Sequence, residues 1–117
     1  MAKERVKEFD LKISKEWLFS FKKRSGKKEE YDFSGIATLR KLLSNEKSRI
    51  LDVVKNQNPK SIYELAKILG RNFKAVSEDV KLLERFELID RVSEKTGNRE
   101  SHRLIINADS LVIRIHI

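Results

Sequence analysis

Residues 61–89 read SIYELAKILGRNFKAVSEDVKLLERFELI, and this stretch decides the fold of the 117-residue chain. Ser61 and Glu64 have the spacing of a capping box, in which the serine hydroxyl accepts from the Glu64 amide and the carboxylate reaches back to the Ser61 amide. Gly70 ends the short helix, because glycine adopts the left-handed closing conformation most easily. The side chains expected on its buried face are Ile62, Leu65, Ala66 and Leu69.

A second helix follows directly and should run over residues 72–86, with Asn72 as its cap. Its apolar residues recur at helical spacing, which predicts an inner face of Phe73, Val76, Val80 and Leu83. The same periodicity leaves an outward face of Lys74, Ala75, Ser77, Glu78 and Lys81. The stretch therefore predicts two packed helices joined by a tight turn.

Working outward, an earlier helix begins after the cap Ser44 and stops before Pro59, with Ile50, Leu51, Val53 and Val54 on one face. After residue 88, two extended stretches flank a polar turn at residues 94–100, which predicts a β-hairpin. The predicted order is helix, helix, tight turn, helix, hairpin.

This order resembles the winged helix-turn-helix DNA-binding domains of the MarR and ArsR type. The residues that carry the resemblance are ELAKILG at 64–70, Val76, and LLERFELI at 82–89. The segment at residues 33–44 is similar to the region before the domain in small archaeal and bacterial regulators, some of which are antitoxins. The resemblance implies an α+β fold: a winged helix-turn-helix with a small antiparallel wing sheet and an N-terminal strand and helix extension. Many relatives have an apolar residue and then serine after the turn glycine, where this chain has Arg71 and Asn72.

In such a domain the recognition helix, here about residues 72–86, enters the major groove, and the wing, here about residues 91–106, meets the backbone or the minor groove. Asparagine can pair with adenine, lysine with guanine, and alanine can meet the thymine methyl group. Glu78 repels phosphate unless it accepts from cytosine. The alternative for each residue is an ordinary solvated surface. The candidate DNA-binding residues are Arg71, Asn72, Lys74, Ala75, Ser77, Glu78, Lys81, Lys95, Asn98, Arg99 and Arg103.

The N-terminal part is predicted as an extension over residues 1–43, followed by a DNA-binding domain over residues 44–117. We expect a strand at residues 6–13, a capped helix at 14–21 that contains Trp17, Leu18 and Phe21, and a basic loop at 22–28. A further helix at residues 34–43 should bury Ile36, Leu39, Leu42 and Leu43. The extension is expected to serve dimerisation or partner binding.

The chain ends in a strongly alternating stretch. Leu111, Ile113, Ile115 and Ile117 fall on one face of a strand by its two-residue period. An uncovered apolar strand at a chain end would fray or aggregate. We therefore expect it to pair with residues 6–13 in one sheet, within a protomer or across a dimer; the alternative is packing against the helical core.

Composition narrows the possible functions. The 26 basic and 18 acidic residues give a net charge of +8, an excess of five before Ser44 and three from Ser44 onward, which favours a polyanionic partner. No apolar run is long enough to cross a bilayer, so we expect a cytoplasmic protein without a membrane partner. The chain has no cysteine, two distant histidines and four isolated glycines. We therefore expect neither metal nor cofactor and no enzymatic activity.

The leading hypothesis is a sequence-specific, homodimeric transcriptional regulator that binds a pseudo-palindromic site in double-stranded DNA. The alternative is an antitoxin that binds a toxin protein and represses its own promoter. A third reading is a basic chromatin-like or membrane-surface protein.

Overall fold

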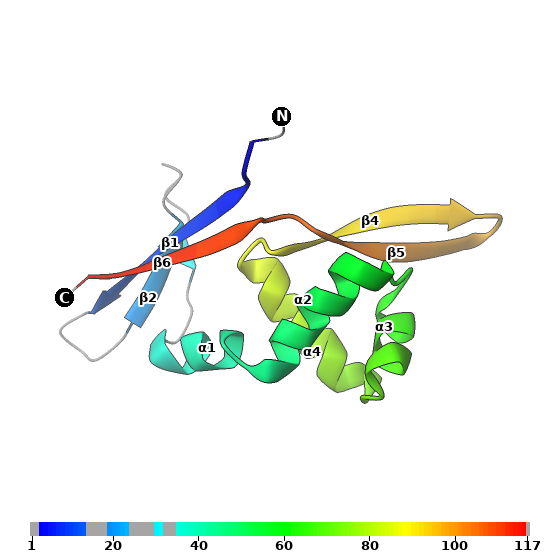
Figure 1. Cartoon of the computed structure of the whole chain (residues 1–117), viewed down its shortest axis with the longest axis horizontal. Coiled ribbons are helices and arrows are strands. Elements are labelled where there is room, and N and C mark those ends of the chain that lie inside the picture. Colours follow the sequence, from blue (N-terminus) through cyan, green and yellow to red (C-terminus); the bar gives the residue numbers. More distant parts are fainter. Residues whose placement is uncertain (1–2, 14–18, 24–29, 32–34, 117) are drawn as a thin grey trace. The chain divides into compact units, whose positions relative to one another are not determined.

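The computed structural model describes residues 3–13, 19–23, 30–31 and 35–116 (Figure 1). These residues form four helices and six strands, so the protein is of the mixed α+β class, as predicted. The chain divides into two units, Met1–Leu43 with Ala108–Ile117, and Ser44–Asn107. The second unit begins at Ser44, the residue at which the sequence analysis divided the chain. Residues 108–117, however, group with the first unit, whereas the sequence analysis placed them in one domain with residues 44–107.

The second unit contains three helices, α2 (Asn45–Gln57), α3 (Ile62–Leu69) and α4 (Phe73–Arg85). Each begins after the residue that was predicted as its cap. The side-chain oxygens of Ser44, Ser61 and Asn72 accept backbone amides of the first turn at 3.3, 3.0 and 2.7 Å. Because these bonds satisfy amides that have no helical partner, the caps determine where each helix starts.

The turn between α3 and α4 depends on Gly70. Its φ is 64°, in the left-handed region. The Gly70 amide donates to the Lys67 carbonyl at 3.2 Å, and the Arg71 amide donates to the Ala66 carbonyl at 3.1 Å. These bonds close α3 and let the chain reverse within two residues into α4.

The core of this unit lies between the helices and the base of the hairpin. Its members are Ile50, Val53, Val54, Ile62, Leu65, Ala66, Leu69, Val76, Val80, Leu83, Phe86, Leu88, Ile89 and Leu104. Phe73 is not among them, although its helical phase predicted an inner position. Its side chain is 52% exposed, whereas Val76 and Val80 are fully buried. The reason is its place in the first turn, where a helical side chain leans toward the N-terminus and so projects past the end of the core.

The hairpin consists of β4 (Ile89–Thr96) and β5 (Arg99–Ile106), paired antiparallel from Ile89↔Ile106 to Thr96↔Arg99. The turn is therefore the two residues Gly97 and Asn98, and the predicted turn at residues 94–100 was too long. Gly97 has a φ of 65°, the positive value that a tight hairpin turn requires at its first residue. Both strands extend past α3 and α4 (Figure 1).

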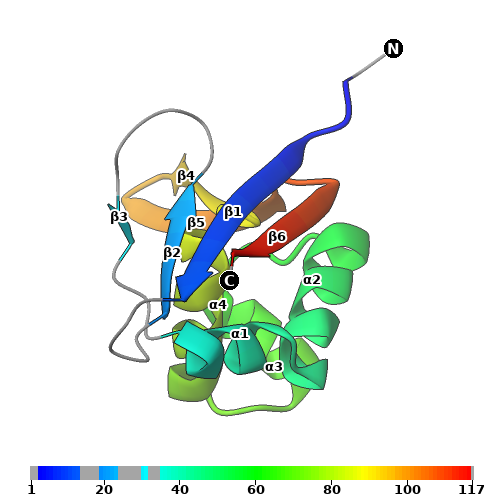
Figure 2. The same ribbon diagram turned by 90° about the vertical axis from the view of Figure 1, so that its left-hand side faces the viewer.

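The first unit contains a sheet of β1 (Val6–Ile13), β2 (Phe19–Lys23), β3 (Glu30–Tyr31) and β6 (Ser110–His116). The strand order is β3-β2-β1-β6, and Figure 2 shows β2, β1 and β6 side by side. β1 pairs antiparallel with β2 and parallel with β6, with Phe9 beside Ile113 and Leu11 beside Ile115. The predicted pairing of the C-terminal strand with residues 6–13 is confirmed, and it occurs within one chain.

Polar contacts join β1 to β6 at both ends. At the start, the Arg5 amide donates to the Asp109 carboxylate at 2.6 Å, and the Asp109 amide donates to the Arg5 carbonyl at 2.7 Å. At the far end, His116 Nε2 lies 3.0 Å from Asp10 Oδ1. These contacts set the parallel register over the length of both strands.

Two predictions for the N-terminal part need correction. Residues 19–21 belong to strand β2 and not to a helix, because Phe19 and Phe21 alternate with polar residues at the two-residue period of a strand. Residues 14–18, with Trp17 and Leu18, lie outside the described residues, as does most of the basic run at 22–28. The predicted helix at 34–43 is present as α1 (Gly35–Leu42), but Leu43 follows its last residue and is 71% exposed.

Candidate nucleic-acid interface

The outward face of α4 is basic. Lys74 and Lys81 are both exposed, and since seven residues make about two helical turns, they lie on the same side of the helix. Exposed Glu78 lies between them on that side. Ala75 and Ser77 are half-buried at the edges of this face. The structure therefore brings these five predicted site residues together on one helix.

Arg85 extends the same face and was missed by the sequence analysis. It is exposed in the last turn of α4, one turn beyond Lys81. Its spacing of four from Lys81 is the signal that could have identified it, because residues four apart are neighbours on a helix surface.

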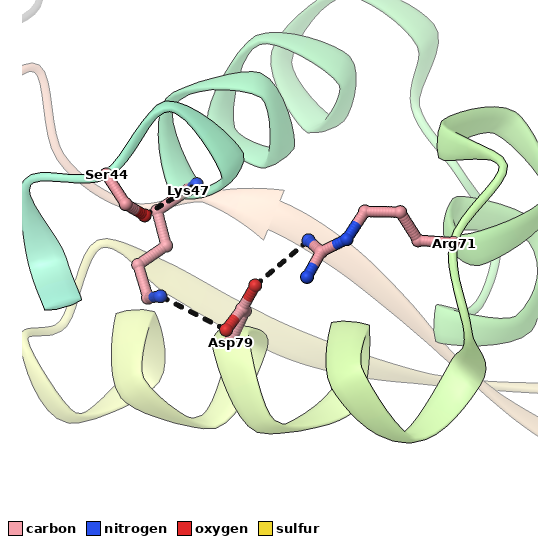
Figure 3. A network of polar contacts seen from close by, with 4 residues as sticks. All are labelled: Ser44, Lys47, Arg71 and Asp79. Atoms are coloured by element: carbon pink, nitrogen blue, oxygen red, sulfur yellow. Dashed lines mark hydrogen bonds and ion pairs between the residues drawn. The ribbon is translucent and has the colours of Figure 1, made fainter.

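A three-residue ionic network lies beside this face (Figure 3). The carboxylate of Asp79 accepts from Arg71 Nη1 at 2.9 Å and from Lys47 Nζ at 3.1 Å. Lys47 is only 7% exposed, so its ammonium group depends on this partner. The network joins the first turn of α2, the turn before α4 and the middle of α4.

Two of the predicted site residues thus already have partners within the chain. Arg71 donates to Asp79, and Asn72 accepts the Lys74 amide as the helix cap. Arg71 keeps further N–H donors on its guanidinium group, and Asn72 keeps its amide N–H donors. Their role in DNA binding stays a prediction, but the structure assigns each of them a structural role as well.

The hairpin presents its predicted site residues on two sides. Lys95, Asn98 and Arg99 are exposed at or beside the tip. Arg103 lies nearer the base, where its guanidinium group is 3.6 Å from Glu94 Oε1. Because side chains alternate along a strand, Arg99 and Arg103 share one side of β5. The residue paired with Lys95 is Glu100, so Lys95 lies on the opposite side.

The hairpin is attached to α4 by an ion pair that the sequence analysis also missed. Arg91 Nη2 on β4 lies 2.7 Å from Glu84 Oε1 on α4, and Arg91 Nε lies 2.8 Å from the same oxygen. Two nitrogens of the guanidinium group thus meet one carboxylate oxygen. This contact holds the base of the hairpin against the helix that carries Lys74 and Lys81.

Within the part of the chain that the structure describes, no group of three or more acidic, histidine or cysteine residues could hold a metal ion. Among the same residues, no helix has the length and apolar composition that crossing a membrane requires.

Comparison with known proteins gives one family. The family model HVO_A0114 matches residues 42–113, which include the whole second unit and the start of β6. The chain belongs to the HVO_A0114 family. No curated protein sequence matches it. In this HVO_A0114-family chain, the α4 face, the ionic network and the hairpin all lie within the matched residues.

Proposed function

We propose that this HVO_A0114-family protein is a sequence-specific transcriptional regulator that binds double-stranded DNA through a winged helix-turn-helix. In this proposal α4 is the recognition helix in the major groove, and the β4-β5 hairpin is the wing on the backbone or in the minor groove. The protein would act in the cytoplasm. The observation that carries the proposal is the outward face of α4, where Lys74 and Lys81 are exposed beside a tight helix-helix turn.

The dimensions of the helix face suit a groove of DNA. Lys74 and Lys81 are roughly 10 Å apart along the helix axis, at 1.5 Å per residue. The major groove, about 12 Å wide, admits one α-helix, so both ammonium groups could reach phosphates or guanine edges. Glu78, between them, weakens phosphate contact and can accept only from a base such as cytosine. A face with this composition suits base reading better than general attraction to polyanions.

The β4-β5 hairpin supports the second proposed contact with DNA, that of the wing with the backbone or the minor groove. Its tip is a two-residue turn with exposed Asn98 and Arg99. The strands project past the helices, so these side chains are available to a DNA backbone or minor groove next to the major groove that α4 occupies. The Arg91–Glu84 ion pair limits how far the hairpin can turn relative to α4.

The regulator is proposed to act as a homodimer on a pseudo-palindromic site, because one recognition helix reads only a few base pairs. Strand β6 supports the proposed homodimer. β6 is an edge strand of its sheet, and its residue Ile115 is 55% exposed. An edge strand with an exposed apolar residue is suited to pairing with the same strand of a second copy.

An antitoxin function is the second candidate, supported by the separate first unit, whose sheet offers a surface distinct from the α4 face. A toxin gene directly beside this gene, and co-purification of its product with the protein, would favour this candidate. A regulator without a toxin partner predicts neither.

The experiment that tests the proposal is selection of bound fragments from a pool of random duplexes, followed by titration of the selected duplex. The proposal predicts an enriched motif and an affinity at least about a thousandfold above that for unrelated DNA. Binding with a specificity ratio near one would point to a chromatin-like protein instead. No binding to duplex DNA at low salt would overturn the proposal.

A further inference from the structure

Phe73 is a large apolar residue whose side chain is exposed at the start of α4. It is the first residue of α4 and is 52% exposed, although it has the helical phase of the buried residues Val76 and Val80. Lys74, next to it in the chain, is exposed on the basic face. The ring therefore lies at the end of the helix that the proposed function places in the major groove.

The backbone that carries this ring is held by the two residues before it. Arg71 is bonded to Asp79, which is itself held by nearly buried Lys47 (Figure 3). Asn72 is held as the helix cap through the Lys74 amide. The backbone on both sides of Phe73 is thus fixed by side-chain hydrogen bonds. A contact residue held in this way loses little conformational entropy on binding.

The chemistry of a phenyl ring restricts what it can recognise on DNA. It has no donor for phosphate and no hydrogen-bonding group for a base edge. The apolar feature of the major groove is the 5-methyl group of thymine, and phenylalanine is among the side chains that contact it. Lys74 and Lys81 attract DNA of any sequence through its phosphates. The phenyl ring, by contrast, can be buried against a methyl group only where the base is thymine.

We propose, on the basis of the function proposed above, that Phe73 determines specificity by packing against a thymine methyl group in the major groove. Phe73 was assigned to the core by its sequence pattern, so this role comes from its observed exposure. The recognised chemical group is the methyl group alone, because uracil presents the same major-groove edge as thymine without it.

The test replaces single thymines of the selected duplex by deoxyuridine, which removes the methyl group and leaves the pairing unchanged. Dissociation constants are measured by fluorescence anisotropy for the wild type, Phe73→Ala and Phe73→Leu. Leu43→Ala serves as a control, because Leu43 is an exposed apolar residue outside the second unit. Thermal melting of each variant checks that it is folded.

At one or two thymines per half-site, the wild type should lose about fourfold in affinity, the effect of burying one methyl group. At those positions Phe73→Ala should bind the thymine and uracil duplexes equally, and Leu43→Ala should behave as the wild type. Phe73→Leu should keep part of the discrimination, and it replaces the alanine variant if that one fails to fold.

Equal thymine preference in the wild type and Phe73→Ala, or no preference in the wild type, would overturn the role of Phe73 while leaving DNA binding intact. A selection that yields no motif would instead overturn the proposed function, and this inference with it. The two failures are therefore distinguishable.

Discussion

Asp79 on α4 and Arg71 in the turn before that helix form an ion pair with 2.9 Å between Oδ2 and Nη1. The other oxygen of the same carboxylate lies 3.1 Å from Nζ of Lys47. Two basic groups thus share one acidic group at the point where α2, the turn and α4 meet. The proposed recognition helix is held in place by charge as well as by its apolar face.

Removal of this carboxylate should destabilise the second unit. We expect Asp79→Ala to lower the free energy of unfolding by about 3 kcal/mol, since breaking a mostly buried pair leaves the Lys47 charge without a partner. Urea denaturation followed by circular dichroism measures this as a lower midpoint. Glu94→Ala is the matched control, because its pair with Arg103 is well exposed and should contribute less than about 1 kcal/mol. Equal midpoints for the two variants would show that the network is not stabilising.

The turn before α4 should tolerate few residues at position 70. Gly70→Ala should cost about 1 kcal/mol, because a side chain is strained at a φ of 64° although the surrounding space is open. Gly70→Asn should cost less, since asparagine adopts left-handed conformations more readily. Thermal melting of the three proteins gives the comparison, and an alanine variant as stable as the wild type would contradict the role given to this glycine.

The basic face of α4 should control the salt dependence of DNA binding. Lys74→Ala and Lys81→Ala should each weaken binding and reduce the slope of log K against log salt by about one, because each lysine releases a counterion. Lys55→Ala is the control, since Lys55 is exposed on α2, outside the proposed contact. Anisotropy titrations at several salt concentrations measure the slopes. A larger change for Lys55→Ala than for the α4 variants would place the DNA elsewhere.

Edge strand β6 should mediate the association of two copies of the chain. Sedimentation of the wild type should give twice the 13.7-kDa chain mass, and Ile115→Lys should shift it toward the monomer with little change in melting temperature. Deletion of residues 111–117 should in addition destabilise the first unit, because it removes the parallel partner of β1. A wild-type monomer at micromolar concentration would contradict the proposed dimer.

Much of the second unit was predictable because its signals are local. Ser44, Ser61 and Asn72 cap their helices through residues two or three positions away, and Gly70 closes a turn of its own. Such bonds depend on spacing along the chain, which a sequence displays directly.

The wrong predictions, and the ion pairs that the sequence did not reveal, have different causes. Phe73 has the helical phase of core residues, but it lies in the first turn of α4 and its side chain is 52% exposed, and periodicity does not reveal where a core ends. The assignment of residues 108–117 to the first unit depends on pairing with β1, about a hundred positions earlier in the chain. The Lys47–Asp79 and Arg91–Glu84 pairs, 32 and 7 positions apart, were missed for another reason: in the sequence any carboxylate is a formal partner for any lysine or arginine.

The proposal that the outward face of α4 reads a DNA sequence can be tested by comparing affinities for two duplexes. Affinities of the wild type, Lys74→Ala and Ser77→Ala are determined for the selected duplex and for a scrambled duplex of equal length and composition. We expect Ser77→Ala to lower affinity for the selected duplex only, and Lys74→Ala to lower affinity for both duplexes, more strongly for the selected one. All three proteins should melt at similar temperatures. Unchanged ratios of selected to scrambled affinity in both variants would contradict the claim.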